Sequence, residues 1–308
     1  MAKLKKRELI LIKIETTQGT DAVPTAALDA MLVFEQSWSF NSARMIERNA
    51  VKGTLGKLQS VFAGTLIDVT FKAEIKGSGA LGVIPEAAAA LRGCGLGETI
   101  VAATSVAYSP VSTGHESVTL YYHEDNSFYK ILGAFGTANL VMNTGELAMY
   151  EFTFTGHVVG PADIALPDAT VDAIKGLAVI NGAFTSLGFA ATIQGVNLDL
   201  GNEISTPDDF NAADGFSDVL IIDNDPNGSF NPQAETVATK DFHGEWKANT
   251  AGAINTGDIG SVAGEKFSLS MPTAYYRELG PGDRDGLTTI EIGYAAAGDD
   301  AAFTLLFN

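Results

Sequence analysis

The strongest constraint on the fold is a hydrophobic pattern that repeats every second residue rather than every third or fourth. The segment 65–76 shows it best, because its apolar residues are Val69, Phe71, Ala73 and Ile75 and the residues between them are polar. This alternation is typical of a strand with one face in a protein core and the other in solvent. The sequence therefore predicts a mainly β protein.

Further strands are predicted around short segments rich in turn-forming residues. Residues 117–122 and 127–132 flank the segment His-Glu-Asp-Asn, and residues 138–142 and 147–156 flank Asn-Thr-Gly-Glu. Each arrangement predicts a hairpin, because strand-forming runs joined by a few turn residues pair antiparallel. Residues 9–15 are predicted to form a strand or an extended arm.

Helical signals are few. Residues 85–92 begin with proline, carry glutamate early and arginine late, and precede a glycine, as helices commonly do. Residues 232–247 are a weaker helical candidate. We therefore expect about two short helices.

Two halves of the chain resemble each other in the order of their predicted elements. The first has strands at 31–40 and 66–75, a helix at 85–92 and a long hairpin that ends at Phe154. The second has strands at 192–200 and 218–222, a helix near 235–246, and strands at 266–271 and 287–294. The pattern predicts an internal duplication, with a first module at residues 1–160 and a second at 161–308. Each module is expected to be a β-sandwich or barrel with one short flanking helix.

Composition excludes several function classes. The net charge is −18, so a basic clamp for nucleic acid is excluded, because phosphate binding requires clustered Lys and Arg. The single cysteine, Cys94, excludes an intrachain disulfide framework and a cysteine-based zinc site. The charge is also uneven: residues 1–160 carry 13 basic and 15 acidic side chains, and residues 161–308 carry 6 and 22.

No targeting or membrane segment is expected. The basic start at residues 1–7 resembles the first part of a signal peptide, but the apolar stretch after it is interrupted by Glu8 and ends at Lys13. The basic start is interpreted as either a frayed terminus or an arm that docks on another subunit. No run approaches the roughly 20 apolar residues of a membrane helix.

Two segments resemble ligand-binding motifs without their context. Residues 77–82 match a dinucleotide-binding glycine pattern, but the strand before them alternates and no βαβ rhythm follows. Residues 223–228 match the first half of a calcium loop, but Ala234 stands where a bidentate glutamate is required. Both are interpreted as connections between elements. The sequence predicts no catalytic residue, no cofactor and no metal site, and hence no enzyme.

The most informative segment is the long loop at residues 42–64, between two predicted strands. Loops of this length inside a compact domain are usually functional or disordered. Its basic residues are Arg44, Arg48, Lys52 and Lys57, against one acid, Glu47. Its apolar residues include Met45, Ile46, Leu55 and Leu58. A basic and partly apolar loop on an acidic protein predicts an arm that grips an acidic neighbour, and the alternative is a flexible loop.

Several passages of the chain resemble the major tail tube proteins of bacteriophages with long, flexible tails (siphovirus-type, Mu-like). The passages are residues 5–25, Leu91-Arg92-Gly93-Cys94-Gly95, residues 108–122, residues 130–137, Glu151-Phe152-Thr153-Phe154-Thr155-Gly156 and Leu198-Asp199-Leu200-Gly201-Asn202. The resemblance covers most of the chain, and it is weakest beyond about residue 211.

The resemblance implies a structural virion protein that assembles into rings. The rings would be trimeric and mimic six-fold symmetry, or hexameric, and the two similar halves favour the trimer. Stacked rings would form the tail tube through which viral DNA passes without specific binding. The other expected partners are the tape-measure protein, the tail terminator and the distal tail or baseplate proteins.

In such proteins the long loop after the first strand stacks on the adjacent ring. Residues 42–64 match that position, so the eight basic and apolar loop residues named above become candidate contacts between rings. The protein is expected in the phage tail, after assembly in the host cytoplasm. The alternative is another ring-forming virion component of the same fold, a tail terminator or a baseplate hub.

Overall fold

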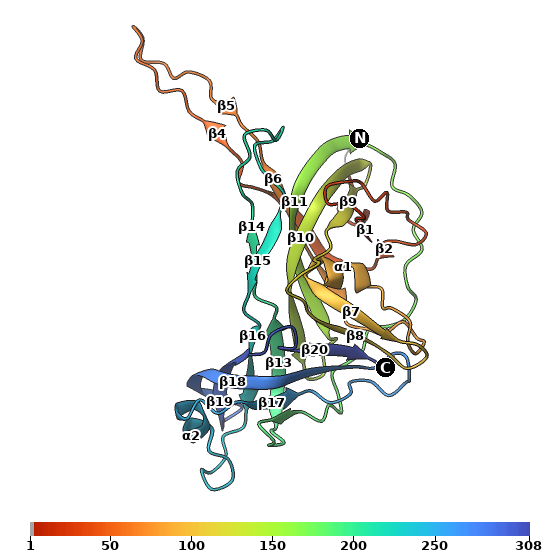
Figure 1. Cartoon of the computed structure of the whole chain (residues 1–308), viewed down its shortest axis with the longest axis vertical. Coiled ribbons are helices and arrows are strands. Elements are labelled where there is room, and N and C mark those ends of the chain that lie inside the picture. The colour runs from red at the N-terminus through yellow and green to blue at the C-terminus, as the bar shows by residue number, and fades with distance from the viewer. Residues whose placement is uncertain (1–2) are drawn as a thin grey trace.

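The computed structural model describes residues 3–308, and antiparallel strands are its main regular structure (Figure 1). The strands of the first half are β1 (Glu8–Ile14), β2 (Ala30–Met31), β3 (Phe34–Asn41), β4 (Met45–Ile46), β5 (Val61–Phe62), β6 (Leu66–Glu74), β7 (Leu96–Val101), β8 (Ser105–Pro110), β9 (Val118–Glu124), β10 (Ser127–Asn143) and β11 (Met149–Asp163). Those of the second half are β12 (Thr185–Ser186), β13 (Ile193–Asp199), β14 (Asn202–Ser205), β15 (Leu220–Asn224), β16 (Asn227–Pro232), β17 (Gly252–Asn255), β18 (Phe267–Arg284), β19 (Leu287–Ala296) and β20 (Thr304–Phe307). The helices are α1 (Ala88–Gly93) and α2 (Phe242–Lys247). The predicted mainly β fold with two short helices is confirmed.

Eight of these strands form one continuous antiparallel run in the order β3-β6-β11-β10-β13-β16-β19-β18. We call β3-β6-β11-β10 the first unit and β13-β16-β19-β18 the second unit. Their strand orders correspond, because in each unit the first strand pairs with the second and a hairpin supplies the third and fourth. The two units meet at a single internal junction, where β10 pairs with β13.

β10 is longer than the sequence pattern indicated. The segments 127–132 and 138–142, predicted as strands of two separate hairpins, are parts of one strand of 17 residues. An irregularity between Leu132 and Phe135 lets the strand bend and stay paired with β11. Because β10 pairs with β9 near its start and with β13 near its end, it connects both units.

The core lies against one face of the eight-stranded run. Phe71, Phe152 and Phe154 are buried together in the first unit, with neighbouring ring centroids 5.3–6.0 Å apart. Phe230 and Tyr294 are buried in the second, 6.0 Å apart. Helix α1 and the strands β1, β7, β8 and β9 supply apolar residues to the same core, which gives the layered packing of a β-sandwich.

The two halves of the chain share this core and this sheet. β20, at the end of the chain, pairs with β18 on one side and with β8 of the first half on the other. The sheet thus continues across residue 160, the predicted module boundary. Whether the two modules are independent folding units stays a prediction.

Both helices are shorter than predicted. The segment at 85–87 forms a turn before α1, in which the Ala88 N–H donates to the Pro85 carbonyl at 3.0 Å. Glu86 is therefore free to accept from the Leu32 N–H and to pair with the buried Lys76 at 3.0 Å. The second predicted helix, 232–247, shrinks to α2, and its first residue instead ends β16.

Other boundaries moved where strand pairing decided them. The predicted strand 31–40 divides into β2 and β3, and the strand predicted at 218–222 is β15, which pairs only with β14. No helix within residues 3–308 has the length and apolar character needed to cross a membrane.

The basic start of the chain contacts its own fold. Lys3 pairs with Glu124 at 3.5 Å and Arg7 with Asp125 at 2.9 Å, both at the turn between β9 and β10. Met1 and Ala2, which belong to the basic start at residues 1–7, lie outside the described residues. A contact of this segment with another subunit stays a prediction.

Candidate functional site

The long loop at residues 42–64 projects away from the body of the molecule as a two-stranded arm (Figure 1). β4 and β5 pair at its root through Met45 with Phe62 and Ile46 with Val61. About nine residues lead from Arg44 to the tip, so the arm reaches roughly 30 Å at the extension of a strand. We call this segment the arm.

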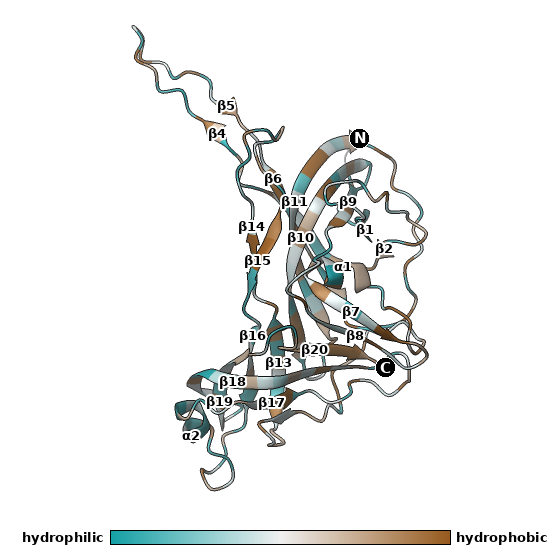
Figure 2. Ribbon diagram, viewed as in Figure 1, coloured by the Kyte–Doolittle hydropathy of each residue, from teal (hydrophilic) through white to brown (hydrophobic). Residues whose placement is uncertain are grey.

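The arm carries apolar and basic residues, and Figure 2 shows hydrophilic and hydrophobic residues along it. Val51 and Leu55 are fully exposed near the tip, and Phe62 is 60% exposed near the root. A soluble protein rarely keeps several large apolar side chains together in solvent unless a partner covers them. The arm is therefore a candidate docking element.

The eight predicted contact residues occupy different parts of the arm. Met45 and Ile46 lie exposed on β4, and Arg48, Lys52 and Leu55 lie exposed toward the tip. Lys57 pairs with Glu47 across the arm at 3.8 Å, and Leu58 is half-buried. Arg44 lies at the root and contacts its own chain. The role of these residues as contacts between rings stays a prediction.

Arg44 joins the arm to the second half of the chain. Its guanidinium pairs with Asp208, donates to the Gly215 carbonyl at 3.3 Å and lies 3.8 Å from the centre of the Phe216 ring. These partners belong to the loop 206–219 between β14 and β15. We call this loop the brace, because it holds the root of the arm.

A second set of contacts ties the brace to β11. His157 donates from Nδ1 to the Asp214 carboxylate at 2.6 Å. Burial would raise the pKa of Asp214, but the hydrogen bonds from His157 and from the Phe216 N–H outweigh it, and the pKa lies below its ordinary value. Gly64 permits the close approach, because a Cβ there would lie 1.9 Å from the Asp214 carbonyl oxygen. The direction of the arm therefore depends on both halves.

The second feature of interest is the polar face of the eight-stranded run, opposite the core. Alternation along the strands places polar side chains there. In the first unit they are Ser37, Ser39, Asn41, Asp68, Thr70, Lys72, Glu151, Thr153 and Asn139, and in the second they are Asn197, Asp199, Ser229, Asn231, Glu278, Glu291 and Arg284. Acids outnumber bases on this face.

The lysine in the middle of the first unit's polar face is matched by acids. Lys72 pairs with Glu35 at 2.8 Å and with Glu151 at 3.1 Å, and the hydrogen bond to Glu35 raises its pKa. The Asn139 amide also donates to Glu151, at 3.2 Å. The face thus carries excess negative charge and does not present Lys72 as an isolated cation for a phosphate.

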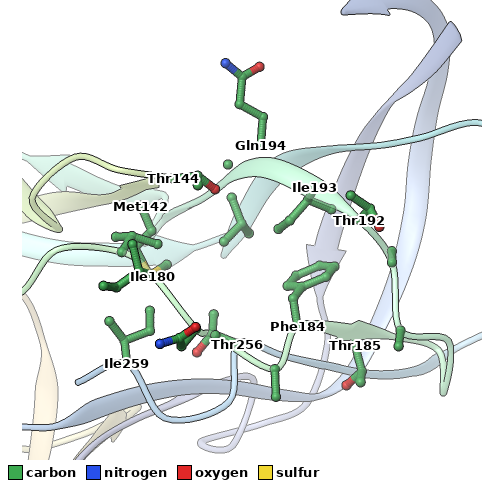
Figure 3. Close-up of a pocket in the computed structure, with 18 residues that line it drawn as sticks. Met142, Thr144, Ile180, Phe184, Thr185, Thr192, Ile193, Gln194, Thr256 and Ile259 are labelled. Atoms are coloured by element: carbon green, nitrogen blue, oxygen red, sulfur yellow. The ribbon is translucent and has the colours of Figure 1, made fainter. Parts of the chain in front are cut away.

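Pockets offer little chemistry. A cavity of about 450 Å³ lies between the segment 179–185, the start of β13 and the segment 256–259, and Phe184, Ile193 and Ile180 are among its lining residues (Figure 3). No described residue that lines it is ionisable, so it holds no acid–base pair. Within residues 3–308 no cluster of His, Cys, Asp and Glu is arranged to bind a metal.

The remaining motifs are connections between elements. Residues 77–82 link β6 to α1, and residues 223–228 span the end of β15 and the start of β16. Cys94 is buried, and burial raises the pKa of its thiol. The arm and the polar face are thus the features that suggest a function.

Sequence reasoning missed the residues that hold the arm. Asp208, Asp214 and Phe216 lie more than 140 residues from the arm, in a segment without a strong periodic pattern. In the sequence, Asp208, Asp214 and Phe216 look like residues of an ordinary acidic loop, so no local pattern marked them as functional. The contacts exist only because the two units lie side by side.

Comparison with known proteins identifies a family. A protein-family model described as "Phage tail tube protein" matches residues 6–301. No curated protein matches the chain.

Proposed function

Because the chain belongs to the phage tail tube protein family, we propose that it assembles with copies of itself into stacked rings that form the tail tube of a phage with a long, flexible tail. In this role the tube conducts viral DNA during ejection. The other partners are the tape-measure protein, the terminator and the distal tail or baseplate proteins. The protein is a structural component of the virion, and it assembles in the host cytoplasm.

The observation that carries the proposal is the pair of four-stranded units joined edge to edge in one chain. Open sheets with unpaired edges tend to pair with another chain, and a closed ring of sheets removes every such edge. Three copies would place six similar units around a ring. We therefore favour a trimer with pseudo-six-fold symmetry, built from modules at residues 1–160 and 161–308.

Ring size supports three copies. Three runs of eight strands, spaced by about 4.8 Å and tilted by about 40°, would close into a barrel roughly 45–50 Å across between backbones. This leaves a lumen that accepts a DNA duplex after side chains are added. Six copies of the same run would give a barrel about twice as wide.

The polar face supports the conduit. If the core faces outward, the acidic and amide side chains of both units line the lumen. DNA phosphates bind to Lys and Arg and release counterions, so a lumen with many free cations would hold DNA in place. A lining in which Lys72 pairs with Glu35 and Glu151 lets DNA slide.

The arm supports stacking. It reaches away from the sheet, and its exposed apolar and basic residues are suited to an acidic, partly apolar neighbour. Arg48, Lys52, Lys57, Met45, Ile46, Leu55 and Leu58 are the proposed contacts with the next ring. Arg44 contributes by holding the arm in position.

Electron microscopy of the purified protein tests the proposal. We expect rings and tubes, and class averages viewed along the axis should show three-fold symmetry with six similar lobes. A strictly monomeric particle at high concentration would contradict self-assembly. Copy number in the virion separates a tube protein, present in many rings, from a terminator or hub, present in one.

A further inference from the structure

The structure contains one complete junction between two units, and it contains two edges that match the two sides of that junction. The junction is the pairing of β10 with β13, in which Val141 lies opposite Asn197. β3 has the same place in the first unit that β13 has in the second. β18 has the same place in the second unit that β10 has in the first.

The edges in question have no strand partner among the described residues. β3 pairs only with β6, and the second half of β18, beyond Ala274, pairs only with β19. Phe40 of β3 is 51% exposed on the core side of the sheet. An unpaired edge beside an exposed aromatic side chain is a surface that tends to pair with another chain.

The irregularities of the strands fix how the two units correspond. In the hairpin of β10 and β11, seven consecutive pairs run from the irregularity to the last pair, Val141 with Met149. In the hairpin of β18 and β19, seven consecutive pairs run from the irregularity to Arg284 with Leu287. Arg284 is therefore the counterpart of Val141.

The other side of the junction is aligned through the strands that pair with β13 and β3. Val196 of β13 pairs with Phe230, and Trp38 of β3 pairs with Val69. Val69 pairs with Phe154 of β11, and Phe230 pairs with Ile292 of β19. Phe154 and Ile292 each belong to the second of the seven consecutive pairs of their hairpin, counted from the irregularity, so Val69 and Phe230 are counterparts. Trp38 thus corresponds to Val196, and Ser39 to Asn197.

We infer that β18 of one copy pairs antiparallel with β3 of the next copy, with Arg284 opposite Ser39, and that this junction repeats the internal one. The inference rests on the proposed ring function and names the surface through which the ring closes. In the same register Gly282 lies opposite Asn41, and Asp283 lies opposite Phe40.

The residues at the edge fit the pairing. Pro281 is the counterpart of Ala138, whose carbonyl accepts from the Leu200 N–H at 2.9 Å in the internal junction. Pro281 keeps the carbonyl that accepts this bond and lacks only an N–H. Proline is tolerated on such an edge, because no strand inside the subunit requires its N–H. The ring of Phe40 would lie diagonally across from Pro281 and lose its exposure.

A cysteine pair measures the register. Val141 and Asn197 lie opposite each other as a pair without direct backbone hydrogen bonds. This follows because the two kinds of pair alternate, and Ala138 and Leu200, three positions along, are joined by a hydrogen bond. Pairs without direct hydrogen bonds place their Cα atoms about 4.5 Å apart. A disulfide spans that distance. The variant Ser39→Cys with Arg284→Cys, in a Cys94→Ala background, should therefore form dimers and trimers linked by disulfides under mild oxidation.

Two matched variants control the experiment. Val141→Cys with Asn197→Cys should close within one chain and produce no linked oligomer. Ser39→Cys with Gly280→Cys shifts one partner by four residues, about 13 Å along the strand, and should not link. Rings of each variant are imaged under reducing conditions, to show that the substitutions leave assembly intact.

The outcomes separate the junction from the function. Linked trimers from the in-register pair alone support the inference. Normal rings that link through the shifted pair, or through neither pair, overturn the junction and leave the tail tube role standing. Failure of the wild-type protein to form any ring at high concentration overturns both.

Discussion

The two units of the sheet share a strand order and differ in the loop that joins their first two strands. In the first unit this loop is the arm, which extends into solvent from residues 42–64. In the second unit, the connection through β14, the brace and β15 folds back against the root of the arm. The difference suggests a division of labour, in which similar strands close the ring and the unequal loops stack it.

This comparison also explains the uneven charge. The first half carries the basic arm, and the second half carries the brace, where Asp208 and Asp214 receive Arg44 and His157. Part of the positive charge at the root of the arm is thus matched inside the chain. The basic residues farther out, Arg48 and Lys52, form no ion pair within residues 3–308, and we propose that they contact another ring.

The largest expected effect comes from removing the arm. Replacing residues 47–60 with a short glycine-containing turn should abolish tubes and leave single rings, because we propose that strands close the ring and the arm stacks it. Electron microscopy and sedimentation measure both states. The control is Phe210→Ser, which removes a fully exposed apolar side chain from the brace without shortening it and should leave tubes intact. Normal tubes without the arm would contradict the division of labour.

The next effect compares the cores of the two units. Phe154→Ala and Phe230→Ala each remove a buried aromatic ring and should lower the free energy of unfolding by about 3–5 kcal/mol. Because one sheet crosses both units and β20 pairs with β8, we expect one cooperative transition in both variants. Guanidinium unfolding followed by fluorescence and by circular dichroism measures this. Two separate transitions, with only one moved by each variant, would show that the units fold independently.

The sequence predicted the strands better than their joining. Alternation at residues 65–76 identified β6, because one face of that strand is buried and the other is polar. The same reasoning predicted two separate strands in place of β10. At residues 133–137 a bend interrupts the alternation, and the strand is continuous there because it stays paired with β11. The local hydrophobic pattern indicates which residues are buried, but it does not indicate which strands pair with each other.

The candidate site was predicted unevenly for the same reason. The length and composition of residues 42–64 identified the arm as unusual, since a loop with Val51 and Leu55 in solvent is unfavourable without a partner. The role of Arg44 depends on the brace, which lies more than 140 residues away. No local pattern indicates that Asp208 and Phe216 would meet Arg44.

Charge reversal on the outer arm should have a smaller effect than deletion. The double variant Arg48→Glu with Lys52→Glu should weaken stacking, because each exposed pair contributes about 0.2–1 kcal/mol and every ring interface repeats the contact. We expect shorter tubes, and the difference in tube length from the wild type should be larger at low salt, where charge interactions are less screened. The control is Lys175→Glu with Lys247→Glu, which makes the same change of charge at two exposed lysines outside the arm. Equal effects of both variants would show that net charge, rather than position, decides stacking.

Removing the guanidinium at the arm root should have a still smaller effect. Arg44→Ala loses the contact with the Phe216 ring and the pair with Asp208, and should lower the free energy of unfolding by about 1–2 kcal/mol. Arms that point in variable directions should stack less regularly. Arg44→Lys keeps the charge but not the planar contact with the ring, so it should restore only part of the stability. Full restoration by lysine would show that charge alone holds the arm.

The smallest effect is the pH dependence of the brace. The pKa of Asp214 in the folded protein lies below 3.8, its ordinary value, so its carboxylate stabilises the fold above pH 3.8. This contribution is lost as the pH falls through the lowered pKa, because a protonated carboxyl no longer accepts the bond from His157 in the same way. Protection against hydrogen exchange at the root of the arm, measured relative to the intrinsic rate at each pH, should therefore fall in acid in the wild type and change less in Asp214→Asn. An equal acid response in both proteins would place the sensitive group elsewhere, and the second unit would then hold the arm through Asp208 and Phe216 alone.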